Sequence, residues 1–441
     1  MAVGYNPRTV TDGLLLALDA GNTKSYDNPT ITYVGGTSDS DNSSSFTLSG
    51  LQAGDLVLYF GAEDNQNQNT PTGASWTAIP GLVTQPDNDG APDSAAFYVL
   101  STGTSVTASG LPSGTNLVHV MIAFRNVDST NPFDVNATEN SASGSLPNPP
   151  SITPVTNNSM IVAVGLLDDD DVANTITPPT GYTTAVNMDS LGGATLNTGI
   201  TGATIMTAYK LLATAAAEDP GAFTSSSGSA GGGEPNKGIS IALRPVTNTT
   251  WTDLIGSNNG TLVNSPTFNS ANGGSLNFTG TNQSVTLGTS TSFAFGTGDL
   301  SIGAWINSAA NQGSFSSIVC LIDGSGGSDW QFDVTNNRPR IYVNGGVIMT
   351  TPVEDVLANN VWYHLFWTRI GSTNSLYING NQVVTATNSE NYDYGELHIG
   401  RNRSGTGLFN GLISTVSIYK GKGLTSAEVL QNYNALKGRY A

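Results

Sequence analysis

The sequence is poor in charged residues and almost free of cysteine. Charged residues make up 11% of the 441 residues, and the single cysteine, Cys320, has no second thiol to pair with in the chain. No disulfide framework can therefore hold the fold, and we expect Cys320 to be a buried small apolar residue. Only 15 residues are Lys or Arg. Because binding to a nucleic-acid backbone needs clusters of such residues, we expect no nucleic-acid partner.

Long hydrophobic runs are missing as well. The longest apolar run near the N-terminus is Leu14 to Leu18, whereas a membrane span needs about twenty apolar residues and a secretory signal needs a longer apolar core. We therefore expect neither membrane insertion nor a signal peptide. The composition nevertheless resembles that of an extracellular protein, which suits a protein that is released by cell lysis, as virus particles are.

Glycine and aromatic residues are plentiful. The chain contains 52 Gly, 15 Tyr, 14 Phe and 6 Trp, and 38% of its residues are apolar. This composition is typical of short strands joined by tight turns, and it argues against long helices and against a disordered chain. The expected fold class is all-β, with room for about two or three domains.

Charge divides the chain unevenly. Residues 28–246 contain 19 acidic and 4 basic residues, a net charge of −15, and the other 222 residues contain 14 acidic and 11 basic residues, a net charge of −3. The middle segment is therefore a compositionally distinct domain.

The middle segment also contains a weak internal repeat. The apolar run and acidic turn at residues 53–65 match residues 157–169, and the run that begins at Phe97 matches the run that begins at Tyr209. Two related sets of strands, packed as one β-sandwich with pseudo-twofold symmetry, are the simplest explanation.

Motifs of the middle segment resemble a known type of domain. GDLVLYFGAEDN, PTGASWTAI, IAFRNVDSTNPFD and ALRP follow one another between about residues 40 and 245. They are similar to the motifs of a β-sandwich domain of phage and bacterial surface proteins. The resemblance implies a fold and no defining activity.

Motifs near the C-terminus resemble a second family. GDLSIGAWINS, NNVWYHLFWTRIG, NSLYINGNQVV, LHIGRN and FNGLIS follow in order from Gly298, as in the laminin-G-like or concanavalin A-like lectin superfamily. The resemblance implies a jelly-roll sandwich. Within these motifs, Asn379-Gly380 predicts a type I′ hairpin turn, because both residues tolerate positive φ.

The two ends of the chain resemble parts of one domain. GLLLALDAGNTKSY, which starts at Gly13, is similar to the opening of phage lectin-like proteins, where it runs almost directly into a segment like TWTDLIGSNNGTLVN. Here that second segment begins only at Thr250. Insertion of a domain at a surface loop explains the gap.

We therefore predict a concanavalin A-like jelly roll made of residues 1–27 and 247–441, with residues 28–246 inserted after its first strand as an acidic β-sandwich. The strand at residues 14–18 should pair with the strand at residues 412–419. A short helix should follow, because Thr425 and Glu428 fit a capping box, and the ending QNYNALKGRY resembles the endings of marine phage structural proteins.

Candidate glycan-binding residues combine aromatic rings with polar groups at a sandwich rim. They are Asp329, Trp330, Tyr392, Tyr394 and Arg401. Core packing or rim structure is the alternative role for these residues. Asp333, on the same strand face as Asp329, is expected to be a solvated rim residue. No strand carries the carboxylate pattern by which retaining glycosidases of this fold resemble one another, so we expect no enzyme activity.

Candidate metal ligands are the four consecutive carboxylates Asp168, Asp169, Asp170 and Asp171. Calcium takes several oxygen ligands and is the one cofactor that this run suggests, with a solvated acidic turn as the alternative. The histidines His119, His364 and His398 fall in strand-like runs without a zinc spacing, and we expect them to be structural.

A mildly basic end completes the list of candidates. It contains Arg401, Arg403, Lys420, Lys422, Lys437 and Arg439, which could dock on an acidic partner or be scattered solvated charges, and the last four are the candidate docking residues. The expected function is that of a non-enzymatic bacteriophage virion surface protein, such as a capsid decoration, fibre or tail-associated adhesin. It would contact other virion proteins and form a homo-oligomer. A carbohydrate-binding adhesin that recognises a host surface glycan is the alternative hypothesis, and a glycan-degrading enzyme is the third hypothesis.

Overall fold

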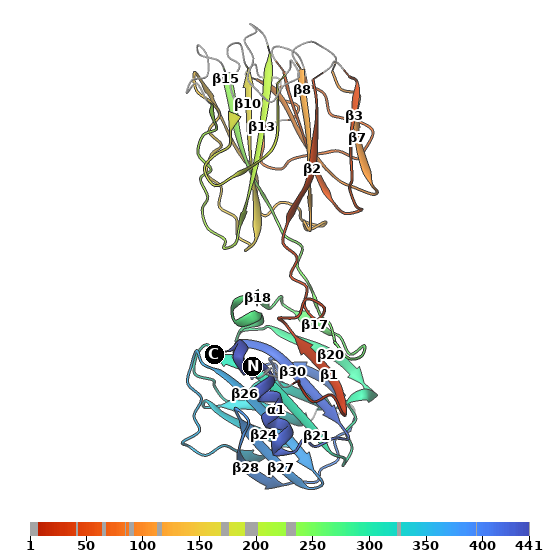
Figure 1. The fold of residues 1–441 in the computed structure, drawn as a ribbon, viewed down its shortest axis with the longest axis vertical. Helices are drawn as coiled ribbons and strands as arrows, with labels where there is room; N and C mark the ends of the chain where they lie inside the picture. Colours follow the sequence, from red (N-terminus) through yellow and green to blue (C-terminus); the bar gives the residue numbers. More distant parts are fainter. Residues whose placement is uncertain are drawn as a thin grey trace, which may run out of the picture. The chain divides into compact units, whose positions relative to one another are not determined.

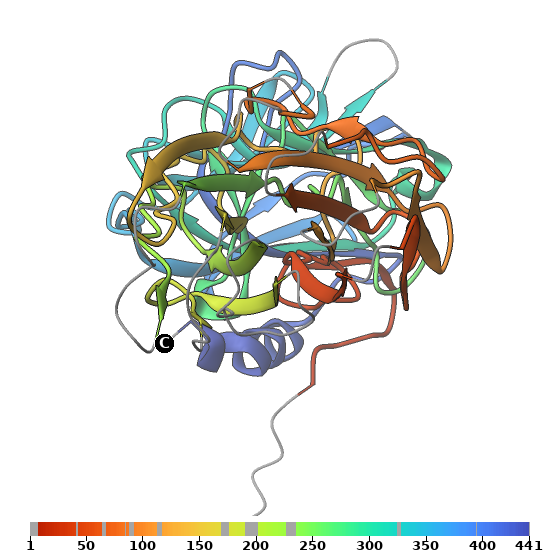
Figure 2. The ribbon, with the colours of Figure 1, turned by 90° about the horizontal axis from the view of Figure 1, so that it is seen from above.

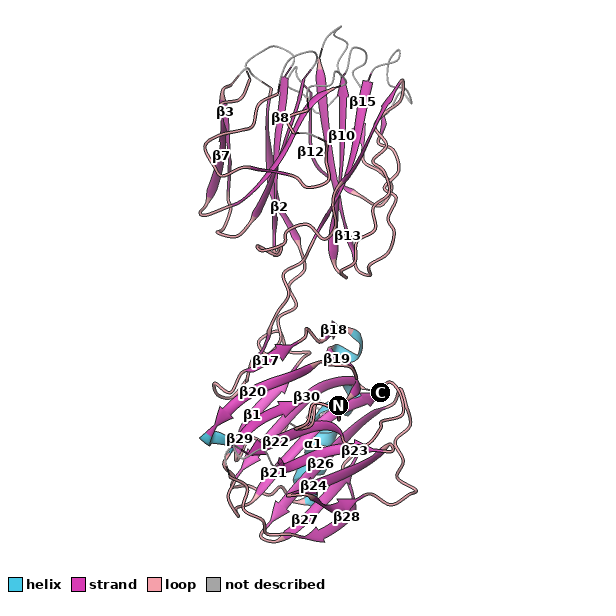
Figure 3. Cartoon of the chain, turned by 180° about the vertical axis from the view of Figure 1, so that it is seen from behind, coloured by secondary structure: helices cyan, strands magenta, loops and turns pink. Residues whose placement is uncertain are grey.

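The structure is a computed structural model that describes residues 8–40, 43–63, 68–83, 85–87, 92–112, 117–168, 176–189, 202–225, 235–323, 328–393 and 395–440. The chain divides into a split unit, Met1–Asn28 with Asn248–Ala441, and an inserted unit, Pro29–Thr247. Strands make up nearly all of the regular structure in both units (Figure 3). The predicted all-β class is therefore confirmed.

Two antiparallel sheets form the split unit, and within the described residues each has eight strands. The first sheet contains, in spatial order, β18 (Thr267–Asn269), β19 (Ser275–Thr279), β30 (Asn410–Lys420), β21 (Leu300–Ser308), β26 (Trp362–Ile370), β27 (Thr373–Ile378) and β28 (Asn381–Thr387), with β1 (Leu14–Asp19) beside β30. The second sheet contains β16 (Thr250–Trp251), β17 (Gly260–Val263), β20 (Ser284–Ser290), β29 (Gly395–Ile399), β22 (Ser316–Asp323), β23 (Ser328–Thr335), β24 (Arg338–Val343) and β25 (Gly346–Thr350).

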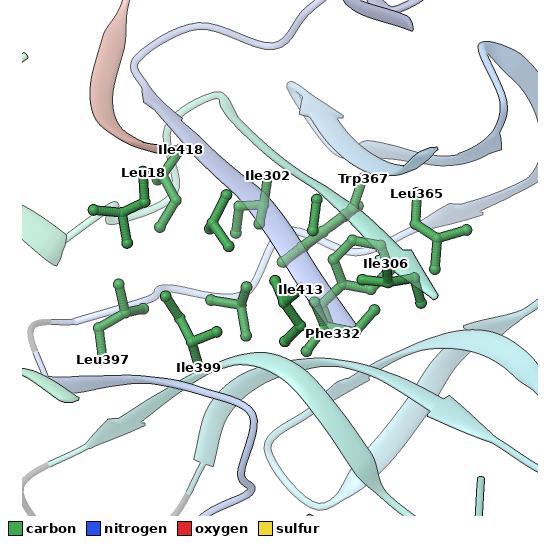
Figure 4. Packing of buried hydrophobic residues seen from close by; sticks show 14 of the residues in the cluster. Leu18, Ile302, Ile306, Phe332, Leu365, Trp367, Leu397, Ile399, Ile413 and Ile418 are labelled. Carbon is green, nitrogen blue, oxygen red and sulfur yellow. The ribbon is translucent and has the colours of Figure 1, made fainter. Parts of the chain in front are cut away.

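The core of the split unit lies between these sheets. Leu18, Trp367 and Ile418 reach into it from the first sheet, and Phe332 and Ile399 reach into it from the second (Figure 4). Each of these side chains is at most 1% exposed. Because side chains alternate between the two faces of a strand, their neighbours in sequence point to the outer faces.

The first strand of the chain pairs with the last one. Leu16 of β1 lies opposite Ile418 of β30, and β1 (red) runs beside β30 (blue) in Figure 1. The predicted pairing is confirmed. The chain leaves and re-enters this unit at adjacent points, because Thr252 N donates to Ser25 O at 2.7 Å and Ser25 Oγ donates to Thr252 O at 2.6 Å.

Helix α1 (Ser426–Leu436) lies on the outside of the first sheet (Figure 2). Both hydrogen bonds of the predicted capping box are present, since Glu428 N donates to Thr425 Oγ1 at 3.3 Å and Thr425 N donates to Glu428 Oε2 at 2.8 Å. Val429 packs against Phe366 and Tyr419. Three short 3-10 helices accompany it in the described residues: η1 (Ala271–Gly273), η2 (Thr291–Phe293) and η3 (Lys437–Arg439).

Two five-stranded antiparallel sheets form the inserted unit within the described residues. The first contains β2 (Thr32–Asp39), β8 (Leu117–Arg125), β4 (Leu56–Glu63), β6 (Asp93–Leu100) and β5 (Thr77–Ala78). The second contains β9 (Thr138–Ser143), β15 (Pro235–Leu243), β10 (Ser159–Asp168), β13 (Ala203–Leu212) and β12 (Thr183–Asp189). Two small sheets join β3 (Ser45–Ser49) to β7 (Ser105–Ser109) and β11 (Ile176–Thr177) to β14 (Thr224–Ser225).

The two large sheets of the inserted unit have corresponding strand orders and enclose one core. Phe60 from the first sheet and Val164 from the second meet there. Leu58 pairs with Tyr98, and Val162, its counterpart in the sequence repeat, pairs with Tyr209. The sequence comparison that set Phe97 against Tyr209 is therefore wrong by one residue, and such a shift reverses the face to which a side chain points.

Backbone features at two glycines agree with the sequence. Asn379 and Gly380 have φ angles of 52° and 81°, as the predicted hairpin turn requires. A Cβ at Gly411, where φ is 146°, would collide with the carbonyl oxygen of Asn307.

Among the described residues, no helix has the length and apolar character that crossing a bilayer requires.

The β1–β30 pairing leads to a prediction about stability. Leu16 is fully buried, so Leu16→Ala should lower the free energy of unfolding by about 2–5 kcal/mol through a cavity in the core. Denaturant titration followed by tryptophan fluorescence measures this, because Trp251, Trp330 and Trp367 lie in the same core. The control Val353→Ala, at a side chain that is 73% exposed, should change it by less than about 0.5 kcal/mol. An equal loss of unfolding free energy for the two substitutions would contradict the conclusion that β1 is part of the stabilising core.

Candidate functional site

A polar but buried row of side chains lies on the outer face of the second sheet of the split unit. Trp330, Phe332 and Val334 of β23 belong to the core, so alternation turns Gln331 and Asp333 to the opposite face. On that face Gln331 is 2% exposed and Asp333 is fully buried. The expectation that Asp333 is a solvated rim residue is therefore wrong.

The Asp333 carboxylate is the hub of this row. It accepts hydrogen bonds from Arg340 Nε at 3.0 Å and Nη2 at 2.8 Å, from Gln331 Nε2 at 2.8 Å and from Thr335 Oγ1 at 2.9 Å. Burial raises the pKa of the Asp333 carboxyl, while its three side-chain donors oppose that shift. The bidentate contact with Arg340 fixes the orientation of both groups.

The donors around Asp333 also hold Phe315, which precedes β22. Phe315 has a φ of 64°, a left-handed conformation that is costly for a bulky residue. Its backbone N donates to Thr335 Oγ1 at 2.9 Å, and its carbonyl oxygen accepts from Gln331 Nε2 at 3.3 Å. The guanidinium carbon of Arg340 lies 4.4 Å from the centre of its ring, and Tyr342 meets the ring edge-on at 5.4 Å.

A tight loop from Asn402 to Gly407 forms the opposite wall. Asn402 Oδ1 accepts from Ser404 Oγ at 3.2 Å, from Thr406 N at 3.1 Å and from Gly407 N at 2.8 Å, so this one amide closes the loop. Only glycine fits at position 407, because a Cβ there would collide with the carbonyl oxygen of Phe315.

Between these walls lies an open cavity of about 830 Å³, a size within the usual range for small-ligand sites. The described residues that line it are Phe315, Gln331, Tyr342, Asn344, Gly345, Asn402, Arg403, Ser404 and Thr406. It offers two aromatic rings together with amides, hydroxyls and one guanidinium. The Arg403 side chain is exposed and makes no hydrogen bond or ion pair with the described residues, so it is available to a ligand.

The glycan-binding residues predicted from the sequence lie mostly elsewhere. Trp330 and Tyr392 are fully buried, so they belong to the core and cannot offer a ring to a sugar. Arg401 Nε donates to Asn402 O at 3.3 Å and thereby supports the loop beside the cavity. Tyr394 lies outside the described residues, and Asp329 lies in β23 with its side chain outside the described part of the structure.

The sequence reasoning missed the residues that line the cavity. Tyr342 could have been found, because alternation in β24 places it on the same face as Arg340 and opposite to Ile341. Phe315 could not, because its position depends on a left-handed backbone outside any strand. Arg403 was noted only as one charge of the basic C-terminal end.

The predicted metal ligands fall at the edge of the described residues. Asp168 ends β10, and Asp169, Asp170 and Asp171 lie outside the described residues. The part of the chain that the structure describes contains no group of three or more His, Cys, Asp or Glu side chains that could hold a metal ion.

The three histidines and Cys320 are buried in strands, as expected. His119 lies in β8, His364 in β26 and His398 in β29. Burial lowers the pKa of His119 to about 4 and that of His364 to about 3. Both rings are therefore neutral at neutral pH.

The predicted docking cations make contacts within the split unit. Lys420 Nζ donates to the carbonyl oxygen of Ser292 at 2.9 Å, and Lys422 pairs with Glu428 at 2.9 Å. Arg439 pairs with Asp19 at 2.7 Å. Lys437 Nζ lies 5.7 Å from the centre of the Tyr433 ring. These contacts help to hold the two chain ends of the unit.

Comparison with known proteins identifies the domain that carries the cavity. Residues 278–430 match the family model of the concanavalin A-like lectin/glucanases superfamily, and all the cavity residues fall within this range. The split unit therefore contains a concanavalin A-like lectin/glucanase domain, as its motifs indicated. No curated protein matches the chain.

Similar solved structures share little sequence with the chain. Trypanosoma rangeli sialidase in complex with the inhibitor DANA is 15% identical with a TM-score of 0.35, and the match covers 43% of this chain and 31% of the sialidase. Domain 4 of AbnA, a GH43 extracellular arabinanase from Geobacillus stearothermophilus, in complex with arabinotriose, is 15% identical with a TM-score of 0.34 and coverage of 41% and 92%. The binding domain of botulinum neurotoxin serotype D/C VPI 5993 is 16% identical with a TM-score of 0.35 and coverage of 42% and 49%. The match spans about a third of the sialidase.

The buried ion pair of Asp333 with Arg340 leads to a prediction about stability. Asp333→Ala leaves the buried guanidinium of Arg340 without its counter-charge, so the free energy of unfolding should fall by about 3–5 kcal/mol. The control is Asp12→Ala, which removes one of the two carboxylate partners of Lys422 at a side chain that is 81% exposed and should cost less than about 1 kcal/mol. Denaturant titration compares the two, and a similar small loss for both would contradict the role of Asp333.

Proposed function

We propose that this protein is a non-enzymatic glycan-binding protein whose concanavalin A-like domain binds a carbohydrate in the cavity beside Phe315. The observation that carries the proposal is the composition of that cavity, in which two aromatic rings lie beside amide, hydroxyl and guanidinium groups. Sugar rings have apolar C–H faces and polar hydroxyl edges, so such a mixture matches them.

The ligand would be held from three sides. A sugar face packs on the exposed parts of Phe315 and Tyr342, and the hydroxyl edges meet the Asn344 amide and the Arg403 guanidinium. Phe315 is fixed in place before the ligand arrives, because Thr335 and the other neighbours of Asp333 hold it. Preorganisation of this kind lowers the entropic cost of binding.

The chemistry of the lining supports binding without hydrolysis. Glycosidases need two carboxyl groups at the scissile bond, and none of the described lining residues is Asp or Glu. Two described carboxylates are hydrogen-bonded to the lining: Asp333 is fully buried and bound to Arg340, and Glu390 accepts from Asn344 Nδ2 at 3.3 Å outside the lining itself. A ligand in the cavity therefore has no described acid and base pair beside it.

We also propose that the protein is displayed on a bacteriophage particle, as a decoration, fibre or tail-associated adhesin. The resemblance of both chain ends to phage proteins supports this placement. The inserted unit carries −15 of the net charge of −18, and like charge keeps particles apart in solution. Other virion proteins and further copies of this chain are the proposed partners, and a host surface glycan is the proposed ligand.

Glycan binding is tested on an array of host surface polysaccharides, followed by titration of the best ligand. Tyr342→Ala and Arg403→Ala should each weaken binding about tenfold or more, because each removes a contact with the ligand. Val353→Ala and Lys24→Ala, at exposed side chains outside the cavity, should leave the affinity unchanged. Absence of binding to any glycan, or equal binding by all variants, would contradict the proposal.

Display on a particle is tested separately. Phage particles from a culture that produces this protein are purified on a density gradient, treated with high salt and labelled with gold-conjugated antibodies against the inserted unit. The protein should remain in the particle fraction, with label on intact particles. Recovery only in the soluble fraction of the lysate would refute a virion location.

A further inference from the structure

The inserted unit encloses a lysine. Lys237 of β15 has a side chain that is only 3% exposed, and its Nζ contacts the Oδ2 atom of Asp87, whose side chain is 5% exposed. In the other ion pairs described in this unit, the side chains of Arg125, Lys210 and Arg244 are each 32% exposed. The Lys237–Asp87 pair thus differs from the rest by being removed from water on both sides.

Both partners of this pair are fixed by the backbone. Lys237 lies on a strand with neighbours on both sides, opposite Leu166 of β10 and Ser141 of β9. Asp87 exchanges two backbone hydrogen bonds with Ser94 of β6, at 2.8 and 2.9 Å. The amine therefore comes from one large sheet and the carboxyl group from a segment bound to the other.

The described surroundings of Lys237 supply fewer acceptors than an ammonium group can use. An ammonium group has three N–H donors, and the acceptors of Lys237 Nζ among the described residues are Asp87 Oδ2 and Ser94 Oγ, the latter at 3.3 Å. Burying an incompletely bonded charge is costly. An amide nitrogen at the same place carries one N–H, for which the Ser94 hydroxyl suffices as acceptor.

We infer that Lys237 and Asp87 form an intramolecular isopeptide bond. A proton passes from the ammonium to the carboxylate, and the neutral amine then attacks the Cγ atom of the protonated carboxyl group. The new bond joins Nζ to Cγ, the bond from Cγ to the hydroxyl oxygen breaks, and the hydroxyl leaves as water with a proton from the nitrogen. One positive and one negative charge disappear together, and no further reactant is needed.

Such a bond would tie the two large sheets of the inserted unit together. It would close a loop between positions that are 150 residues apart, and a cross-link over a long loop restricts the unfolded chain strongly. A chain with a single cysteine cannot achieve this with an internal disulfide. The inference concerns the inserted unit alone and does not depend on glycan binding in the split unit.

Intact-mass spectrometry of the denatured full-length protein tests the inference. The mass should be lower than that of the sequence by one water molecule. A proteolytic digest should contain one branched peptide that joins the segments around Asp87 and Lys237. A mass equal to that of the sequence, without a branched peptide, would overturn the inference.

Variants assign the bond to its two residues. Lys237→Arg keeps the positive charge but lacks the amine, and Asp87→Ala lacks the carboxyl group, so both should have the full sequence mass. Lys210→Arg, at the half-buried lysine that pairs with Glu218, is the matched control and should still lack one water. If Lys237→Arg still lacks one water, the bond is not at Lys237. The mass of the natural chain is measured separately from the masses of the variants. A variant that folds poorly therefore does not change the result for the natural chain.

Discussion

Three side chains that converge on the Asp333 carboxylate position the aromatic wall of the cavity. Arg340, Gln331 and Thr335 are held by this one buried acceptor, and the same three residues contact Phe315. The left-handed backbone of Phe315 costs on the order of 1–3 kcal/mol, so it persists only where its neighbours impose it. A structural ion pair under the sheet surface is thus what places an aromatic ring in the cavity above it.

A second constraint comes from the division of the split unit into two sequence segments. Its first strand, β1, must pair with β30 across almost the whole chain, and the hydrogen bonds between Ser25 and Thr252 bring the ends of the insertion together. The split unit therefore keeps a continuous core although its sequence is interrupted. One chain thus combines a unit that is nearly neutral with an inserted unit that carries most of the negative charge.

Much of the fold was predictable because it follows from local rules. Alternation, turn residues such as Asn379-Gly380 and ordered motifs identified the sandwich and the β1–β30 pairing. The alignment of Tyr209 was wrong by one residue because the repeat is weak and no local feature of the sequence fixes its register. Lys237 and Asp87 could not be paired from the sequence, because they meet only through the packing of two sheets.

The site was harder to predict for a physical reason. Trp330 and Gln331 are neighbours on a strand that is covered on both faces, and the sequence does not say which face joins the main core. The structure puts Trp330 in the core and Gln331 beside the cavity. Phe315 lies in a loop whose conformation depends on long-range contacts with Thr335 and Arg340. Sequence reasoning therefore identified the correct strand, β23, but chose Trp330, whose side chain points to the face opposite the cavity.

The most direct measurement is a crystal structure of the full chain with an oligosaccharide that the protein binds in solution. The account predicts density for a sugar ring against Phe315 and Tyr342, with a hydroxyl or ring substituent in hydrogen-bond contact with Arg403. Density for the sugar at another surface, with the cavity filled only by water, would contradict the claim that the Asp333 network builds a carbohydrate site.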